Sequence, residues 1–300
     1  MKNALVIGEC MVELSLTGER SAAIGYAGDT FNTAVYLQRL GVPTRYATAL
    51  GGDDPFSNAI AALMHDEGVN DELAVRVAGR LPGLYAIETD ARGERRFHYW
   101  RESSPAREFM DQVDPEALRR AMDEASLIYV SAITLAILGE SGRGRLIELL
   151  RTAARSGAAV VLDTNYRARL WSSPDLARSA VEAVAPVCRF VSMSTSDVSG
   201  FGLDPSAAAQ RWAAGAAEVV LRADDGAIRV LGGAAEATLP PPGPCKVVDT
   251  TGAGDAFNAG YLASRLAGDP PPLALLRART LAEAVIAHRG AIIPKSAMPL

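Results

Sequence analysis

Hydrophobic positions along this chain are concentrated in short, almost uninterrupted runs. Five such runs occupy residues 4–8, 127–133, 158–164, 189–193 and 218–222. Strands that are buried on both faces have this pattern, and such strands belong to parallel sheets. The pattern therefore predicts a central sheet that is mostly parallel.

Helical periodicity separates these runs. Apolar residues from Leu146 to Ala153 recur at i, i+3, i+4 and i+7, and Gly157 provides a stop. Residues 30–40 and 115–125 also have helical patterns, the second with a capping Asp and a Pro at its start. Alternating strands and helices predict an α/β sandwich with right-handed crossovers, formed as a single domain over residues 1–300.

Two segments, at about 9–27 and 81–105, interrupt this alternation with shorter and more polar patterns. In the second segment, two strand-like runs flank "DARGE" at 90–94, which predicts a hairpin turn. We expect the two segments to form a small β-sheet lid that projects from the main sheet. An antiparallel edge added to the main sheet would give the same pattern, so this alternative stays open.

Composition narrows the class of protein. The chain has 300 residues, 49% of them hydrophobic, and a formal net charge of -5 without a block of Lys or Arg, so no nucleic-acid partner is expected. Its three cysteines are far apart, which favours reduced thiols in the cytoplasm over a disulfide framework. No apolar stretch approaches the roughly 18 residues of a membrane helix, and Glu9 interrupts the first apolar run, which favours a buried strand over a signal peptide.

The string "VVDTTGAGDAFNAGY" at 247–261 combines small residues, an acidic residue and a helical apolar pattern. The first turn of a helix leaves backbone N–H donors unpaired, and the helix dipole makes that end an anion site. A carboxylate such as Asp255 is unexpected in an anion site. It is explained if the anion is a transferring phosphoryl group and the carboxylate accepts a proton from the attacking hydroxyl. Asp is also a common helix cap, so "GAGD" alone leaves both interpretations open.

Longer strings extend the pattern over nearly the whole chain. "DTTGAGDAFNAGY" resembles the C-terminal signature of the PfkB (ribokinase-like) carbohydrate kinases, and "GYAGDTFNTAVYLQRLG" resembles their first signature, with Ala27 in place of one glycine. "ALGGDDPFSNAI" is similar to a further glycine-rich region, with Ser57 where Gly is common. The resemblance implies a three-layer α/β/α sandwich with a small β-sheet lid. Walker A and GxGxxG motifs are absent from the sequence, which disfavours P-loop kinases and dinucleotide-dependent dehydrogenases.

Within that family, "FHYWRESSPAREF", "LDTNYRARLW" and "HRGAIIPKSAMP" are most similar to kinases of 2-keto-3-deoxygluconate. The resemblance implies ATP-dependent phosphorylation of the terminal hydroxyl of this sugar acid. Arg101 suits the substrate, because an Arg can hold a carboxylate with charge-assisted hydrogen bonds. The alternatives are another kinase of the family, acting on fructose, ribose or a nucleoside, and a non-catalytic sugar-acid sensor.

The resemblance also implies roles for individual residues. Asp255 is the expected catalytic base, and Gly252, Ala253 and Gly254 form the expected anion hole. The expected sugar side comprises Gly28, Asp29, Thr30, Phe31, Tyr85, Tyr99, Arg101 and Arg167, together with Asp255. The expected nucleotide side comprises Asn165, Arg167, Arg222, Asp224, Gly226, Gly252 and Gly254. Trp100 alternates with its neighbours and is expected to face away. Asp163 is either a helix-entry cap, the preferred interpretation, or a residue that supports the site from behind.

The cofactors implied by the resemblance are ATP and Mg²⁺, the latter held mostly by phosphates and water. The three His residues are too scattered for a protein metal cage. The resemblance further implies a monovalent cation such as K⁺ near Asp249 and Thr251. It also implies a homo-oligomer formed through the lid edge strands. Two motifs differ from the family pattern: "LRADDG" has Leu221 and Ala223 in place of Lys and Gly, and "STSD" has Asp197 in place of Glu.

Overall fold

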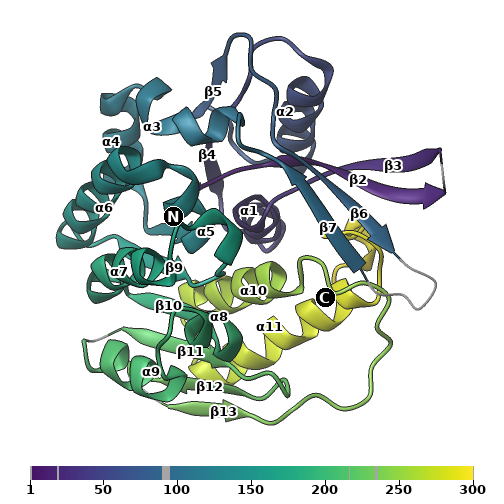
Figure 1. Ribbon diagram of the computed structural model, residues 1–300. Helices are drawn as coiled ribbons and strands as arrows, with labels where there is room; N and C mark the ends of the chain where they lie inside the picture. Colours follow the sequence, from purple (N-terminus) through teal and green to yellow (C-terminus); the bar gives the residue numbers. More distant parts are fainter. Residues whose placement is uncertain (1, 19, 90–94, 216, 234–235, 300) are drawn as a thin grey trace.

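A nine-stranded sheet runs through the computed structural model of the chain, which describes residues 2–18, 20–89, 95–215, 217–233 and 236–299 (Figure 1). The strand order is β13-β12-β11-β10-β9-β8-β1-β4-β5. Neighbours from β11 to β5 pair in parallel, whereas β12 and β13 are antiparallel. The strands are β1 (Ala4–Ile7), β4 (Thr44–Gly51), β5 (Ala74–Val77), β8 (Leu127–Ser131), β9 (Ala159–Asp163), β10 (Phe190–Ser194), β11 (Glu218–Arg222), β12 (Ile228–Leu231) and β13 (Ala237–Leu239). Each of the five apolar runs coincides with a parallel strand to within two residues at either end, which confirms the predicted sheet.

Helices cover both faces of this sheet (Figure 1). One face carries α1 (Asp29–Arg39), α2 (Pro55–Glu67), α10 (Ala253–Ala267) and α11 (Pro271–Ile286). The other face carries α3 (Phe109–Gln112), α4 (Pro115–Glu124), α5 (Ala132–Ile137), α6 (Gly139–Arg155), α7 (Pro174–Val184), α8 (Thr195–Gly200) and α9 (Pro205–Ala214). Short 3₁₀ turns are η1 (Pro105–Glu108), η2 (Ala168–Leu170), η3 (Ala185–Val187) and η4 (Lys295–Ala297).

The strands supply both hydrophobic cores because their side chains alternate between the two faces. In β8, Ile128 and Val130 belong to the core beneath α3–α9, while Leu127 and Tyr129 belong to the core beneath α1, α2, α10 and α11. This arrangement confirms the predicted three-layer α/β/α sandwich. Among the described residues, no helix has the length and apolar character needed to cross a membrane.

A second sheet of four strands projects from the main body (Figure 1). Its order is β3-β2-β6-β7, formed by β2 (Met11–Gly18), β3 (Ser21–Ala27), β6 (Leu84–Thr89) and β7 (Arg95–Trp100). Two antiparallel pairs, β2–β3 and β6–β7, join through a parallel pairing of β2 with β6. The small sheet is therefore separate, and the alternative of an added edge on the main sheet is wrong. The predicted turn at 90–94 lies outside the described residues.

Candidate active site

A cavity of about 870 Å³ lies where the second sheet meets the carboxyl ends of the parallel strands. Asp163 ends β9 and Arg222 ends β11, and both line the cavity. Met11, Tyr85 and Tyr99 line it from the second sheet. Ligands of open α/β sheets bind at this edge, and the volume is within the roughly 300–1,000 Å³ typical of small-molecule sites.

Helix α10 begins directly at the cavity. Gly252 precedes it with φ of 78°, and a Cβ there would be 2.6 Å from the carbonyl oxygen of Ala291, so the backbone conformation and the space both require glycine. Asp255 is the acidic residue of the first turn, and the N-cap position itself is Gly252, which has no side chain to cap the helix. Its Oδ2 instead accepts a hydrogen bond from Asn32 Nδ2 at 2.8 Å. The carboxylate of Asp255 is therefore directed at α1 and the cavity rather than at its own helix end, contrary to the cap interpretation.

The surroundings of Asp255 suit a proton acceptor. Burial, and then the nearby Asp29 carboxylate, raises the pKa of Asp255 well above its ordinary value, while Asn32 and Arg167 act in the opposite direction. Asp29 is the first residue of α1, and its Oδ2 accepts a hydrogen bond from Asn165 Nδ2 at 3.0 Å. A carboxylate with a raised pKa accepts a proton from an alcohol more readily than an ordinary Asp does.

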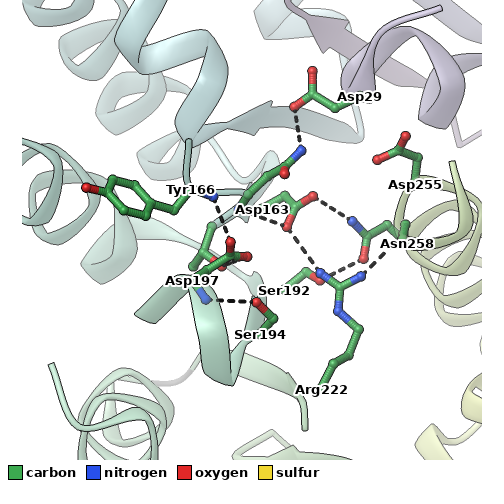
Figure 2. Close-up of polar contacts among 12 residues, drawn as sticks. Asp29, Asp163, Tyr166, Ser192, Ser194, Asp197, Arg222, Asp255 and Asn258 are labelled. Carbon is green, nitrogen blue, oxygen red and sulfur yellow. Dashed lines mark hydrogen bonds and ion pairs between the residues drawn. The ribbon is translucent and has the colours of Figure 1, made fainter. Parts of the chain in front are cut away.

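Figure 2 shows a polar network around Asp163, which lies close to Asp29 and Asp255. Asp163 Oδ2 accepts hydrogen bonds from Tyr129 OH at 3.1 Å and Asn258 Nδ2 at 3.0 Å, and Ser192 Oγ donates to Asn258 Oδ1 at 2.6 Å. Burial raises the pKa of Asp163 to about 6, opposed by Arg222. The interpretation of Asp163 as a helix-entry cap is wrong, because this side chain ties β8, β9 and α10 together in the interior.

Arg222 extends from the end of β11 toward the start of α10. Its Nη2 lies 3.4 Å from Asp163 Oδ1, and its Nη1 donates to the carbonyl oxygen of Gly254 at 3.5 Å. The guanidinium carbon is also 5.8 Å from the centre of the Phe257 ring. Arg222 is thus fixed beside the first turn of α10, where an anion would meet the backbone N–H groups.

The wall formed by the second sheet is aromatic and contains a buried ion pair. The rings of Tyr85 and Tyr99 are 5.7 Å apart, and Tyr85 OH donates a hydrogen bond to Glu13. Arg101 Nη2 pairs with Glu9, and the two residues are only 5% and 3% exposed. Arg101 therefore lines the cavity with its charge already balanced by a carboxylate of the protein.

Carboxylates and hydroxyls line the side of the cavity where a nucleotide is expected. Asp197 accepts hydrogen bonds from the backbone N–H of Tyr166 at 3.0 Å and from Thr164 Oγ1 at 3.2 Å. Arg167 Nη1 lies 4.0 Å from Asp197 Oδ1, and the Arg167 side chain is 51% exposed. Asp224 accepts a hydrogen bond from Thr195 Oγ1 at 2.7 Å.

Most residues predicted for the site line this one cavity: Gly28, Asp29, Tyr85, Tyr99, Arg101, Asn165, Arg167, Arg222, Asp224, Gly252, Gly254 and Asp255. Thr30 and Phe31, predicted for the sugar side, are instead fully buried. Thr30 Oγ1 is 2.9 Å from Tyr46 OH, and the Phe31 ring packs edge-on against the ring of Tyr46. Both side chains anchor the start of α1 to β4.

Two more predicted residues are outside the cavity lining. Ala253 is the first residue of α10, and Gly226 forms a turn with φ of 85°, packed so that a Cβ would meet Pro242 at 2.7 Å. In contrast, Asn32 and Arg169 line the cavity although the sequence analysis assigned them no role. Asn32 could have been found from helical spacing, because it is three residues after Asp29 and so shares its face.

An open α/β sheet that places a carboxylate beside a glycine-rich helix start, beneath a second sheet, is suited to phosphoryl transfer to a small hydroxylated substrate. A similar fold occurs in the crystal structure of a fructokinase with bound ATP from Xylella fastidiosa, with a TM-score of 0.83 and 22% identity over 100% of this chain and 96% of that one.

Residues 1–298 match the model of the pfkB family carbohydrate kinases, and the chain belongs to that family. It is 41% identical over 311 residues to a 2-dehydro-3-deoxygluconokinase of Dickeya dadantii, covering 99% of each chain. It is 39% identical over 310 residues to a 2-dehydro-3-deoxygluconokinase of Escherichia coli K12, again covering 99% of each chain.

Proposed function

We propose that this protein is an ATP-dependent kinase that phosphorylates the terminal (6-) hydroxyl of 2-keto-3-deoxygluconate, giving 2-keto-3-deoxy-6-phosphogluconate (the reaction of EC 2.7.1.45). The observation that carries the proposal is the position of Asp255 in the first turn of α10, held by Asn32 and directed at the cavity. The substrate assignment is supported by the two full-length relatives, which bear the name of this activity.

In the proposed reaction, Asp255 takes the proton of the terminal hydroxyl as its oxygen attacks the γ-phosphorus of ATP. The bond between the γ-phosphorus and the bridging oxygen breaks, and ADP leaves. Backbone N–H groups at 252–254, together with Arg167 and Arg222, stabilise the negative charge of the transferring group. Arg222 is held in place before the reaction by Asp163 and the carbonyl oxygen of Gly254, and such preorganisation makes the stabilisation effective.

Mg²⁺ is expected to arrive with ATP. Among the described residues, no group of three or more His, Cys, Asp or Glu is arranged to hold a metal. Asp197 is the carboxylate whose chemistry fits best, because it is partly exposed at the cavity and Mg²⁺ prefers oxygen ligands. When bound, Mg²⁺ would neutralise charge on the phosphates.

The proposal also includes a monovalent cation such as K⁺ near Asp249 and Thr251. Equal activity with K⁺ or with tetramethylammonium as the sole monovalent cation would argue against it.

The second sheet is proposed to act as a lid that excludes water, which would otherwise compete as the phosphoryl acceptor. Its inner wall supplies Tyr85, Tyr99 and Arg101 to the sugar side. Arg101 would hold the substrate carboxylate with the part of its guanidinium that Glu9 does not occupy.

Replacing Asp255 with Asn tests the catalytic proposal. The substitution keeps the shape of the side chain but removes the proton acceptor, so turnover should fall by about 10²- to 10⁴-fold while sugar binding by calorimetry survives. In the unmodified protein, turnover should rise with pH through the raised pKa of Asp255, because the deprotonated form is the active one. Asp66→Asn, an exposed acidic residue on α2, is the matched control. Near wild-type turnover in Asp255→Asn would remove the base role.

The outer face of the second sheet suggests self-association. Leu16, Ile24 and Trp100 are 46%, 58% and 59% exposed there, opposite the cavity wall. We propose that this face forms a homo-oligomer in the cytoplasm, where free Cys10, Cys188 and Cys245 are compatible with reducing conditions. Sedimentation should find an oligomer that Ile24→Glu dissociates, and a monomer at all concentrations would contradict this assembly.

A further inference from the structure

Arg169 occupies the boundary between the main body and the second sheet. It belongs to η2, which follows β9, and its exposed side chain lines the cavity. The guanidinium carbon is 4.9 Å from the centre of the Tyr99 ring in β7. This contact joins η2 to β7, the lid strand that ends directly before Arg101.

The arginines that line the cavity differ in whether a carboxylate of the protein lies beside the guanidinium. Arg101 pairs with Glu9, Arg222 pairs with Asp163, and Arg167 lies 4.0 Å from Asp197. In the part of the chain that the structure describes, no carboxylate lies within ion-pair distance of Arg169. Among the described residues, Arg169 therefore gives the cavity a positive charge that no neighbouring carboxylate balances.

The stacking on Tyr99 suits Arg169 for binding a carboxylate. A guanidinium over an aromatic face is held by a cation–π interaction, and the N–H groups around its edge stay available as donors. These donors match the two oxygens of a carboxylate in a bidentate arrangement. The side chain is thus oriented before substrate binds, so less conformational freedom is lost on binding.

We infer that Arg169 pairs with the carboxylate of the sugar acid and determines the preference for an acidic over a neutral acceptor. This inference rests on the proposed function and deepens it. Arg101 contributes hydrogen-bond donors to the same group, but Glu9 has already compensated its charge. Arg169 supplies the net positive charge that the substrate carboxylate requires once it leaves water.

Steady-state kinetics of Arg169→Gln and Arg169→Lys provide the test, with Mg·ATP and two acceptors. The first acceptor is 2-keto-3-deoxygluconate, and the second is its methyl ester, which keeps the terminal hydroxyl and loses the charge. Arg155→Gln, an exposed arginine at the end of α6, is the matched control for loss of one positive charge.

A hydrogen bond to a charged group contributes about 1.5–3 kcal/mol, which corresponds to roughly 10- to 150-fold in binding. Arg169→Gln should therefore raise KM for the acid at least about tenfold. Its kcat and the KM for the ester should change little, and Arg169→Lys should recover part of the loss. The control should match the unmodified protein.

Two results would overturn the inference while the proposed function stands. The first is an unchanged KM for the acid in Arg169→Gln. The second is an equal rise in KM for acid and ester, which would mean that Arg169 only holds the lid strand through Tyr99. If the unmodified protein does not phosphorylate the acid at all, the proposed function fails and the inference fails with it.

Discussion

Removing the charge of Arg101 should destabilise the protein far more than removing an ordinary surface arginine. Arg101 and Glu9 are 5% and 3% exposed, and Arg101 Nε and Glu9 Oε1 find no hydrogen-bond partner among the residues that the structure describes. Arg101→Met would leave the Glu9 carboxylate buried and unpaired. Breaking a buried ion pair from one side costs about 3–5 kcal/mol, a large part of the roughly 5–15 kcal/mol that stabilises a folded domain.

The double variant Glu9→Gln/Arg101→Met separates the cost of the isolated charge from the loss of packing. It removes both charges, so its free energy of unfolding should lie clearly above that of Arg101→Met alone. A suitable control is Arg80→Met, because Arg80 pairs with Glu108 where the two side chains are 41% and 31% exposed. An exposed pair of this kind contributes at most about 1 kcal/mol.

Urea unfolding of the four proteins, followed by circular dichroism with shared slopes, measures these differences. From most to least stable, we expect the order unmodified protein, Arg80→Met, double variant and Arg101→Met. A loss below about 1 kcal/mol in Arg101→Met, equal to that of the control, would refute it. The same experiment gives the fraction of each Arg101 variant that is folded without urea. KM values of these variants can then be compared under conditions where nearly all of the protein is folded.

Two further substitutions test the interior of the site. Burial raises the pKa of Asp163 from 3.8 to about 6, so the stability linked to this proton is full below about pH 4 and is lost as pH rises through 6. Relative to the unmodified protein, Asp163→Asn should gain about 2–3 kcal/mol in urea unfolding between pH 4 and pH 7, and a constant difference would contradict the buried-carboxylate account. A Cβ at Gly28 would be 2.1 Å from the backbone oxygen of Glu9, so Gly28→Ala should cost about 1–3 kcal/mol and lower kcat/KM by shifting α1. An unchanged melting temperature in that variant would show that the backbone gives way freely.

The parts of the fold that the sequence predicts best are those set by local pattern. The apolar runs at 127–133 and 158–164 contain β8 and β9, and the glycine-rich string at 247–261 contains the start of α10. The sequence predicts these elements because a continuous apolar run and a glycine-rich helix start are both properties of residues that are adjacent in the chain. The boundaries differ by one or two residues at strand ends, where hydrogen bonding rather than hydropathy decides.

Roles that depend on distant partners were harder to predict. Thr30 and Phe31 follow Asp29 in the same string, but helical geometry turns them away from the cavity and into the core. The pairing of Arg101 with Glu9 joins residues 92 positions apart, and the bonds of Asp163 reach β8, β11 and α10. No local signal in the sequence distinguishes an arginine that is already paired, such as Arg101, from Arg169, which has no carboxylate partner within the described residues.

The most direct test of the proposed function is a coupled assay of ADP release with Mg·ATP and four acceptors: 2-keto-3-deoxygluconate, 2-keto-3-deoxygalactonate, fructose and ribose. The proposal predicts rapid turnover of 2-keto-3-deoxygluconate and little or no turnover of fructose and ribose. Turnover of a neutral sugar in preference to the acid would leave the fold and the role of Asp255 standing but contradict the substrate assignment. Absence of ADP release with all four acceptors would contradict the proposed activity itself.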